Sequence, residues 1–433
     1  MSEARAAGES DVETRTLARV TRRLVAFSFL CYVVAYIDRI NIGFVSGVLQ
    51  RELGLSHAAY GFGAGLFFLG YFVFEVPSNL ILEKVGARIW IARIMIVWGF
   101  VSMAMVFVRG EQSFYAMRVA LGLAEAGFFP GIILYLTYWI PARERAKSGA
   151  LFMTAAPVAI LIGAPVSEAL LRLDGWLGLA GWKWLFIVEG LPAVVLGLVA
   201  LLVLTDRPEQ ASWLDPEGRA WLSAEMAREQ QARKRHGAGW ESLLDPKVLL
   251  VCLIYFLNTT VTYGLFLWLP QMIEEAFGGR RFVAVMIPFA FALVAMVLVG
   301  RHSDKTGERK WHVAGSSFVA ALGLLLAAAF RSDPWMLVAS FTICQIGQRS
   351  VQPTFWTLPP LFLGGTAAAA GIAVINSVGN LGGYLGPWAM GTLRDLTHSH
   401  TGGLLMLAGA LVLQAALVAS LRLPPGEARP PRA

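Results

Sequence analysis

The sequence predicts an all-α integral membrane protein with twelve transmembrane helices in two pseudo-symmetric six-helix halves. The chain of 433 residues is 56% hydrophobic and 15% charged, whereas soluble proteins carry about 25% charged residues. Its apolar residues form twelve long blocks, and about 20 apolar residues are enough for a helix to cross the hydrocarbon core. A long polar segment separates the first six blocks from the last six, which indicates two halves.

The amino-terminal half is predicted over residues 24–204, after a polar tail over residues 1–23. The tail has no apolar stretch before a cleavage site, so we expect no signal peptide and an uncleaved first span. Gly and Pro interrupt several blocks, and membrane helices tolerate both residues better than soluble helices do. The six spans predicted in this half are 24–49, 58–80, 90–108, 113–139, 148–171 and 184–204.

The polar residues 205–247 predict a cytoplasmic linker with helix-forming patches. The carboxy-terminal half follows over residues 248–422, with a cytoplasmic tail over residues 423–433. A long linker between two six-span halves is typical of transporters that bind their substrate between internal repeats. The six spans predicted in this half are 248–273, 282–300, 312–330, 335–358, 367–392 and 402–421.

The basic residues sort by segment and do not form one patch. The net charge is +7, and most Lys and Arg residues fall in segments that share a side of the membrane with the amino terminus. This asymmetry follows the positive-inside rule and predicts that both termini are cytoplasmic, so the charge needs no nucleic-acid partner. The three Cys lie within predicted spans and none of the six His lies at a span centre. We therefore expect no disulfide, no metal site and no cofactor other than protons as the coupling ion.

Four ionisable residues lie within predicted spans of the first half. Asp38 and Arg39 are halfway along the first span, and Arg118 and Glu125 lie in the fourth. A charge near the bilayer centre costs at least about 2.5–3.5 kcal/mol on insertion scales, so such residues usually mark an ion or substrate pathway. The alternative interpretation is that the four charges only neutralise one another and fasten the helices together.

Each of these four residues has a predicted role in transport. Arg39 offers a planar, permanently charged group suited to a carboxylate. Asp38 and Glu125 are the predicted proton-binding groups, because a carboxyl that is buried without a fixed partner favours its protonated form. Arg118 is the predicted charge partner of deprotonated Asp38. Asp38 and Arg39 are consecutive, hence about 100° apart around the helix, so we expect one to face the cavity and the other a neighbouring helix.

Four uncharged side chains within the spans are candidate substrate contacts. The tyrosine lies in the middle of the second span and either hydrogen-bonds the substrate or packs with its hydroxyl satisfied. The tryptophan and the two asparagines belong to the second half and are placed to orient a hydroxylated acid. Glu75 and Glu189, by contrast, are predicted near span ends and interpreted as structural acids. The four candidates are Tyr71, Trp356, Asn376 and Asn380.

Arg349 is a charge near the middle of the second half. Its span also carries Gln345, Gln348 and Gln352, which fits the wall of a polar cavity. One hypothesis is that Arg349 binds a second carboxylate, so that the substrate is a diacid. The alternative is that the guanidinium reaches back to loop carbonyls.

A weak internal repeat supports a duplication. The loop after the second span reads Asn79-x3-Glu83-Lys84-x-Gly86-x-Arg88, and the loop after the eighth reads Gly300-x3-Asp304-Lys305-x-Gly307-x-Arg309. The spacing is identical, and both loops follow the second span of their half. Acid, base and glycine in so tight a loop predict a conformational latch to a neighbouring helix end. The predicted latch residues are Glu83, Lys84, Arg88, Asp304, Lys305 and Arg309.

These loops resemble the signature of the major facilitator superfamily, Gly-x3-Asp-Arg/Lys-x-Gly-x-Arg/Lys. The second copy fits it, whereas Asn79 and Glu83 depart from it in the first copy. Other segments resemble the anion:cation symporter branch of that superfamily, and together they cover nearly the whole chain. They are YIDRINIG at 36–43, EVPSNLILEKVGAR at 75–88, RVALGLAEAGFFPG at 118–131, GWKWLFIVEGLPAVVLG at 181–197, PTFWTLPP at 353–360 and INSVGNLGGYLGP at 375–387.

The resemblance implies the major facilitator fold and a monomer in the plasma membrane, expected to be a bacterial inner membrane. It implies an organic acid as substrate, such as a sugar acid, tartrate, phthalate or hydroxyphenylacetate. It also implies that Asp38 and Glu125 take part in proton coupling and that Arg39 takes part in anion binding.

These features together predict a secondary active transporter that imports an organic carboxylate by proton symport through alternating access. The expected partners are a small organic anion, protons and the lipid bilayer. The alternative is a proton-coupled antiporter that exports a drug or metabolite, although the central Arg39 favours an anion. A membrane receptor or a polytopic enzyme is a third possibility. The sequence offers no nucleophile–base pair, metal-ligand cluster or phosphate-binding loop for catalysis, so we expect no enzymatic activity.

Overall fold

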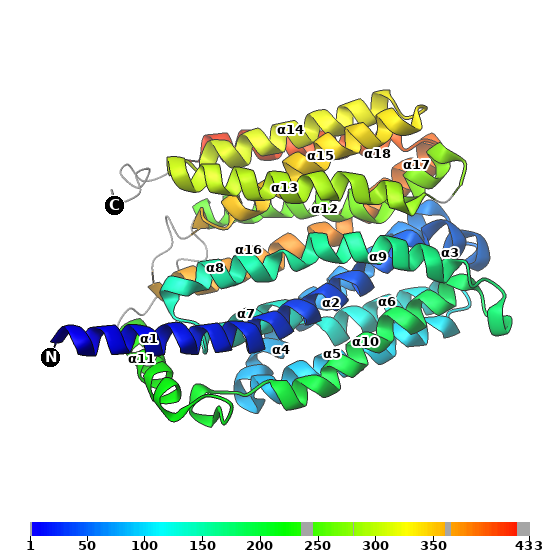
Figure 1. Ribbon diagram of the computed structural model, residues 1–433. Coiled ribbons are helices and arrows are strands. Elements are labelled where there is room, and N and C mark those ends of the chain that lie inside the picture. The colour runs from blue at the N-terminus through cyan, green and yellow to red at the C-terminus, as the bar shows by residue number, and fades with distance from the viewer. Residues whose placement is uncertain (1, 235–245, 280, 360–364, 422–433) are drawn as a thin grey trace.

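The computed structural model describes residues 2–234, 246–279, 281–359 and 365–421. These residues form an elongated bundle in which long helices lie side by side, with the first half of the chain on one side and the second half on the other (Figure 1). Helix α1 begins and α18 ends at the same end of the bundle, which we call the terminal end. The opposite end is called the far end.

The first half is built from helices that alternate in direction through the bundle. Ser56 caps the start of α4, because its hydroxyl accepts a hydrogen bond from the Ala59 backbone N–H at 3.0 Å. The elements are α1 (Ser2–Val20), η1 (Thr21–Val25), α2 (Ala26–Phe44), α3 (Ser46–Leu53), α4 (His57–Val85), α5 (Ala87–Met103), η2 (Ala104–Phe107), α6 (Glu111–Glu125), α7 (Phe128–Thr137), α8 (Ala142–Met153), α9 (Ala155–Leu171), η3 (Trp176–Gly178) and α10 (Gly181–Val203).

The second half has the same plan. Asp333 caps α15 by accepting hydrogen bonds from the backbone N–H groups of Trp335 and Met336, both at 2.9 Å. The elements are α12 (Pro246–Phe277), α13 (Phe282–Thr306), α14 (Lys310–Ala329), α15 (Pro334–Phe355), α16 (Gly365–Asn380), α17 (Gly382–Thr397) and α18 (Thr401–Ser420).

All twelve predicted spans coincide with helices or with helix pairs of the structure. Within the described ranges, ten helices are long and apolar enough to cross a membrane by length and composition. The remaining two predicted spans are α15 and the broken pair α16–α17. Gln345, Gln348 and Arg349 make α15 less apolar than its neighbours.

Two spans are broken near the middle, and both breaks follow a predicted site residue. Helix α6 ends at Glu125, and Gly127 at the start of α7 has a φ of +84°. A Cβ atom at Gly127 would lie 2.3 Å from Ser78 Oγ, so only glycine fits both the backbone angle and the space. The other break separates α16 from α17 directly after Asn380.

The halves are in direct backbone contact at the far end. A Cβ atom on Gly61 of α4 would lie 2.3 Å from the Pro387 carbonyl oxygen, and one on Gly391 of α17 would lie 2.1 Å from the His57 carbonyl oxygen. Small residues allow membrane helices to approach this closely. The packing of α4 against α17 therefore closes the far end between the two halves.

Hydrogen bonds reinforce this closure. The carboxylate of Asp395 on α17 accepts from the backbone N–H of His57 at 3.2 Å and from that of Ala58 at 2.7 Å. Gln50 on α3 donates to Gln271 on α12 at 3.1 Å. Because the first N–H groups of a helix lack partners within the helix, Asp395 caps α4 from the other half.

The two repeated loops share a backbone feature but differ in their contacts. Gly86 and Gly307 occupy the same motif position and have φ angles of +99° and +68°, which favour glycine. In the first loop, the Arg88 backbone N–H donates to the carboxylate of Asp206 at 2.8 Å. In this structure Asp206, which follows α10, therefore occupies the start of α5.

In the second loop the charged residues bind one another. Arg309 pairs with Asp304 at 2.6 Å and donates to Ser303 at 3.0 Å. The start of α14 is capped by Glu308, which accepts from the backbone N–H groups of Trp311 and His312. The motif acid therefore closes its own loop and does not reach the next helix in this structure.

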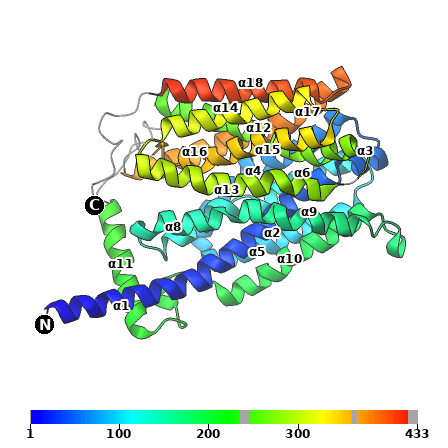
Figure 2. The ribbon, with the colours of Figure 1, turned by 45° about the horizontal axis from the view of Figure 1, so that its top comes forward.

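The predicted amino-terminal tail and linker are largely helical. Residues 1–23 contribute α1, which continues into the first span and projects beyond the bundle beside α11 (Pro216–Lys234), as Figures 1 and 2 show. A short turn, η4 (Pro208–Gln210), precedes α11. Arg143 joins these parts by pairing with Glu13 and Glu225 at 2.5 and 2.8 Å. The predicted carboxy-terminal tail, 423–433, and linker residues 235–245 lie outside the described residues.

Candidate functional site

Arg39 and Glu125 form an ion pair in the centre of the first half. The Arg39 Nη2 group on α2 donates to Glu125 Oε1 at the end of α6. The Glu125 side chain is 0% exposed and that of Arg39 is 10% exposed. Removal of this pair from water strengthens its attraction. The guanidinium predicted to bind a substrate carboxylate is thus occupied by a carboxylate of the protein.

Aromatic rings surround the Arg39 guanidinium. Its central carbon lies 5.9, 5.3 and 5.5 Å from the ring centres of Tyr36, Phe67 and Tyr71, within the range of cation–π attraction. Tyr71 is buried. The structure therefore places the predicted contact Tyr71 beside Arg39, where its ring stabilises the cation.

The Arg39 group also reaches the second half of the chain. Its Nη1 group donates to the hydroxyl of Tyr263 on α12 at 3.4 Å. The Tyr263 ring packs on Phe68 of α4, with 4.2 Å between ring centres. The site therefore lies at the interface between the halves, as the sequence predicts.

Asp38 faces the other way from Arg39. Its Oδ1 atom accepts hydrogen bonds from the Ser102 hydroxyl of α5 and from Asn41 Nδ2, the latter at 3.1 Å. Its Oδ2 atom is buried and has no hydrogen-bond partner among the described residues. The expectation that these two consecutive side chains point in different directions is confirmed.

The predicted pair of Arg118 with Asp38 is not formed in this structure. Arg118 is buried, donates to the Ala64 backbone carbonyl at 3.3 Å, and lies 5.2 Å from the Phe67 ring centre. Its Nε and Nη1 atoms are without a hydrogen-bond partner in the described part of the chain. The physical reason is direction, since Arg118 extends toward α4 while Asp38 extends toward α5.

Glu75 joins the halves at their centre, which the sequence interpretation missed. Its Oε1 atom accepts from Asn376 Nδ2 at 2.8 Å and its Oε2 atom accepts from Ser377 Oγ at 3.0 Å. Asn380 interacts with the same carboxyl. Two predicted substrate contacts, Asn376 and Asn380, are therefore engaged by an acid that was interpreted as structural.

Arg349 is part of a buried polar cluster between α12 and α15. Arg349 is 6% exposed, and its guanidinium lies 5.5 Å from the Phe289 ring centre. Gln348 donates to the Asn258 carbonyl at 3.0 Å and to Thr262 Oγ1 at 2.7 Å. The cluster contains several buried polar atoms without a hydrogen-bond partner among the residues described. They are Arg349 Nε, Gln345 Oε1, Gln348 Oε1, and both side-chain polar atoms of Asn258.

Such unpaired buried polar atoms are costly unless something binds them. Arg349 has no acidic partner among the described residues. It also interacts electrostatically with Tyr263, which bonds to Arg39. The predicted reach of Arg349 to loop carbonyls is not seen. Arg349 Nε and Asn258 Nδ2 are the donors of this cluster that have no partner among the described residues, and they are suited to an anion.

Trp356 lies apart from these groups. Its ring meets that of Tyr255 with 4.8 Å between centres and that of Phe355 with 5.2 Å. These rings belong to an apolar cluster that includes Val248 and Leu421. The structure therefore does not bring Trp356 beside Arg39, because it follows α15 toward the terminal end.

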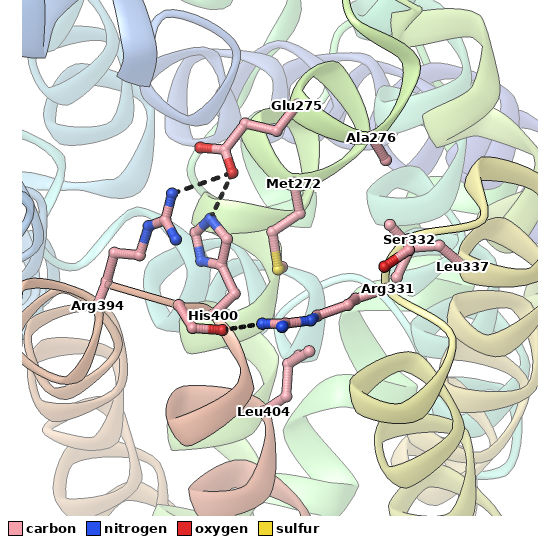
Figure 3. A pocket seen from close by; sticks show the side chains of 10 residues that line it. Met272, Glu275, Ala276, Arg331, Ser332, Leu337, Arg394, His400 and Leu404 are labelled. Carbon is pink, nitrogen blue, oxygen red and sulfur yellow. Dashed lines mark hydrogen bonds and ion pairs between the residues drawn. The ribbon is translucent and has the colours of Figure 1, made fainter. Parts of the chain in front are cut away.

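A polar cavity of about 360 Å³ lies within the second half at the far end. Figure 3 shows the Glu275 carboxylate facing Arg394 and His400, while Arg331 enters from the opposite side. Glu275 Oε2 lies 3.3 Å from Arg394 Nη2 and 3.2 Å from His400 Nε2. These pairs tie α12 to α17 and to the residues before α18. We interpret them as a structural cluster, since Glu275 neutralises Arg394.

The sequence pointed to most of this site but missed several partners. Ser102, Tyr263 and Ser377 are small or aromatic residues inside apolar blocks, where their sequence context resembles ordinary packing. Their role depends on which helices pack together, and a single sequence taken alone carries no such signal. Glu75 carried a signal, since an acid inside an apolar block is costly.

Comparison with known proteins agrees with the fold. Residues 28–387 match the model of the Major Facilitator Superfamily. A "Putative tartrate transporter" of Agrobacterium vitis is 52% identical, covering 94% of each chain. A "Quinolone resistance transporter" of Acinetobacter baumannii is 42% identical, covering 92% of this chain and 93% of the other. The inward open structure of the xylose transporter XylE from E. coli has a TM-score of 0.77 at 16% identity, covering 93% of this chain and 96% of the other.

Proposed function

Because the chain belongs to the major facilitator superfamily, and is thus a multi-pass membrane transporter and not an enzyme, we propose that it imports an organic carboxylate by proton symport. The observation that carries this proposal is the Arg39–Glu125 pair. A permanently charged guanidinium suits a carboxylate substrate. Because the Glu125 carboxyl occupies that guanidinium, a proton on Glu125 would make Arg39 available to the substrate. The name of the Agrobacterium vitis relative supports an organic anion as substrate.

Proton binding and substrate binding are linked through Arg39. A proton on Glu125 removes the negative charge that holds Arg39, and the freed guanidinium then binds the substrate carboxylate. Asp38 is the second proposed proton site, since one of its oxygens is buried without a partner among the described residues. Arg118 is proposed to approach Asp38 in another conformation, where the deprotonated acid needs a counter-charge.

Alternating access requires the far-end contacts to open. With both termini proposed to be cytoplasmic, as the distribution of basic residues indicates, the far end faces the exterior and is shut here by Asp395 and the α4–α17 packing. The opposite state would separate these contacts and join the halves at the terminal end. The residues proposed to latch that state are Glu83, Lys84, Arg88, Asp304, Lys305 and Arg309.

The substrate is proposed to be a dicarboxylate. One carboxylate would bind Arg39 in the first half and the other Arg349 in the second, with Tyr71 and Tyr263 between them. Arg349 Nε and Asn258 Nδ2 support this, because they are donors without a partner among the described residues and a carboxylate accepts hydrogen bonds from guanidinium and amide N–H groups. We further propose a monomer in a bacterial inner membrane, with protons as the only cofactor.

The alternative function is a proton-coupled antiporter that exports a drug or metabolite. The name of the relative called a quinolone resistance transporter is the reason to test it. The test is uptake by purified protein in proteoliposomes of labelled tartrate, phthalate, hydroxyphenylacetate and sugar acids, with and without an inward proton gradient. Accumulation of one acid against its gradient is expected. Efflux driven only by the opposite proton gradient would instead establish the exporter.

A further inference from the structure

The Glu75 carboxyl of the first half accepts hydrogen bonds from donors of the second half. The carboxyl extends from α4, is 4% exposed, and accepts from Asn376 and Ser377 of α16. Both oxygens of the carboxyl accept a hydrogen bond from α16, an arrangement that suits the ionised carboxylate. The contacts cross the interface that must rearrange during transport.

The donors that hold Glu75 have the properties of a substrate site. Asn376 and Ser377 lie in α16, which ends at Asn380 where the span is broken. In transporters, polar groups beside broken helices commonly bind the substrate or its coupling ion. An amide N–H and a hydroxyl directed at one point are suited to a carboxylate or hydroxyl group.

The Arg39 site shows the same relationship in the first half. There Glu125 occupies the guanidinium proposed to bind the substrate. Arg39 also interacts electrostatically with Glu75, so the two sites belong to one centre. In each half, a carboxylate of the protein stands where a carboxylate substrate would find its donors.

We propose that Glu75 holds the place of the substrate in the empty carrier, and that the substrate displaces it from Asn376 and Ser377. This inference rests on the proposed import of a carboxylate. The displaced Glu75 would repel the incoming anion at short range in a medium of low dielectric. Displacement is therefore accompanied by proton binding, in which the Glu75 carboxylate and one proton from the aqueous pathway form a neutral carboxylic acid. The substrate carboxylate replaces the charge that Glu75 loses.

The groups that face Glu75 do not take up a proton near neutral pH. Arg39 faces it from α2, Tyr71 lies one turn away on α4, and Tyr255 faces it from α12. The α16 groups are uncharged amides and a hydroxyl. Arg39 stays protonated throughout the accessible pH range, and tyrosine hydroxyls ordinarily titrate near pH 10. Among these neighbours Glu75 is therefore the group that can take up a proton near neutral pH, and Glu125, which also binds Arg39, is the proposed site of a separate proton.

The test counts the protons bound with each substrate molecule. Purified protein in detergent is titrated with tartrate, or with the acid that the proteoliposome uptake identifies, and the proton number is taken from the slope of log Kd against pH. Calorimetry in buffers of different ionisation enthalpy measures the same number independently. The variant is Glu75→Gln, which keeps the size of the side chain and cannot take up a proton.

The control is Glu52→Gln. Glu52 accepts from Trp182 Nε1 at 2.7 Å, and both residues belong to the first half. We expect Glu75→Gln to bind about one proton fewer per substrate molecule than the wild type, so that for each unit rise in pH its affinity for substrate falls about tenfold less than that of the wild type. The Glu52→Gln variant is expected to match the wild type.

An unchanged proton number in Glu75→Gln would overturn the proposal. Glu125→Gln, measured in parallel, tests the proposed function separately: an unchanged proton number there removes Glu125 from coupling and leaves the result for Glu75 standing. Should Glu75→Gln not purify as a monodisperse protein, the double variant Asn376→Ala, Ser377→Ala replaces it. Loss of both donors is expected to weaken substrate binding at least tenfold, and an unchanged Kd would show that they serve only to join the halves.

Discussion

The guanidinium of Arg39 on α2 pairs with the carboxylate of Glu125, the last residue of α6. The pair lies where the fourth span breaks before Gly127. The carboxy-terminal end of a helix carries a partial negative charge, which repels a carboxylate at that position. Arg39 therefore supplies the attraction that keeps ionised Glu125 in place, and the two become separable when either a proton or a second carboxylate arrives.

Replacing Glu125 with Gln is expected to uncouple transport from protons. The glutamine cannot bind a proton and does not hold Arg39 by charge, so substrate can bind and cross without the proton that Glu125 carries. Counterflow exchange should persist within about threefold of the wild type, while accumulation should fall by the share that this proton supplies, about tenfold for a gradient of one pH unit. The measurement is both assays in the same proteoliposomes.

The control for this variant is Glu111→Gln at the start of the same helix, where the carboxylate only accepts from Tyr115 at 2.8 Å on the surface. It should accumulate substrate normally. Undiminished accumulation by Glu125→Gln would remove that residue from the mechanism and leave its pairing with Arg39 as a structural contact.

Arg349→Gln is expected to discriminate between diacids and monoacids. If Arg349 binds the second carboxylate, tartrate should bind about 10- to 100-fold more weakly, the range for loss of a buried charge-assisted hydrogen bond. A four-carbon sugar acid with a hydroxymethyl group in place of one carboxylate should bind within about threefold of its wild-type affinity. Isothermal titration of both acids provides the measurement, and an equal loss for both would show that Arg349 does not contact the second carboxylate.

The sequence predicted the membrane spans and the charged centre because both depend on burial alone. Long apolar blocks must become helices in lipid, and Asp38 and Arg39 must diverge because consecutive residues point in different directions. The identical spacing around Gly86 and Gly307 likewise predicted matching loops, and both glycines have positive φ angles.

The sequence did not reveal which residue each charged group binds. Glu125, and not Asp38, pairs with an arginine, and Asp206, which lies outside the repeated loop, binds the start of α5. Glu75 was interpreted as structural although it joins the halves. Such choices depend on helix register and side-chain direction across an interface, where a shift of one residue changes the partner. Hydrophobic periodicity does not fix that register.

Asp395→Asn is expected to weaken the closed far end. The carboxylate caps the positive end of α4 from the other half, and such a cap contributes about 0.5–2 kcal/mol. Its loss should therefore shift the population toward the state open at the far end by about 2- to 30-fold. Cysteines introduced at Arg51 and Ser332, both exposed and in different halves, allow spin-label distances across this end to be measured. The native cysteines are buried, which favours labelling at the introduced sites.

Asp333→Asn is the matched control for the far end. Asp333 also caps a helix by accepting two backbone N–H groups, but the helix belongs to its own half. Its replacement should leave the distance distribution unchanged. If Asp395→Asn also leaves the distribution unchanged, the α4–α17 glycine packing alone holds that end shut.

Acidification is expected to release the linker helix α11 from α1. The Gly218 backbone N–H bonds to the carboxylate of Asp215 at 2.7 Å and, with Arg19 at 2.5 Å, holds the pKa of that carboxyl below its usual value. A lowered pKa in the folded state means that the contact stabilises the folded form above the ordinary aspartate pKa of about 3.9. That contribution is lost as the pH falls through the lower, folded-state value.

Hydrogen exchange over residues 216–234, corrected for the intrinsic effect of pH, measures this release. In the wild type, protection should be constant from neutral pH to about pH 4 and should fall below it. Asp215→Asn should exchange about 3- to 10-fold faster at neutral pH, since the amide keeps one acceptor but loses the charge that attracts Arg19. Glu111→Gln is the control, because Glu111 accepts from Tyr115 within α6, away from α1 and α11. Equal exchange in all three proteins at neutral pH would mean that other contacts, such as those of Arg143, hold α11 in place.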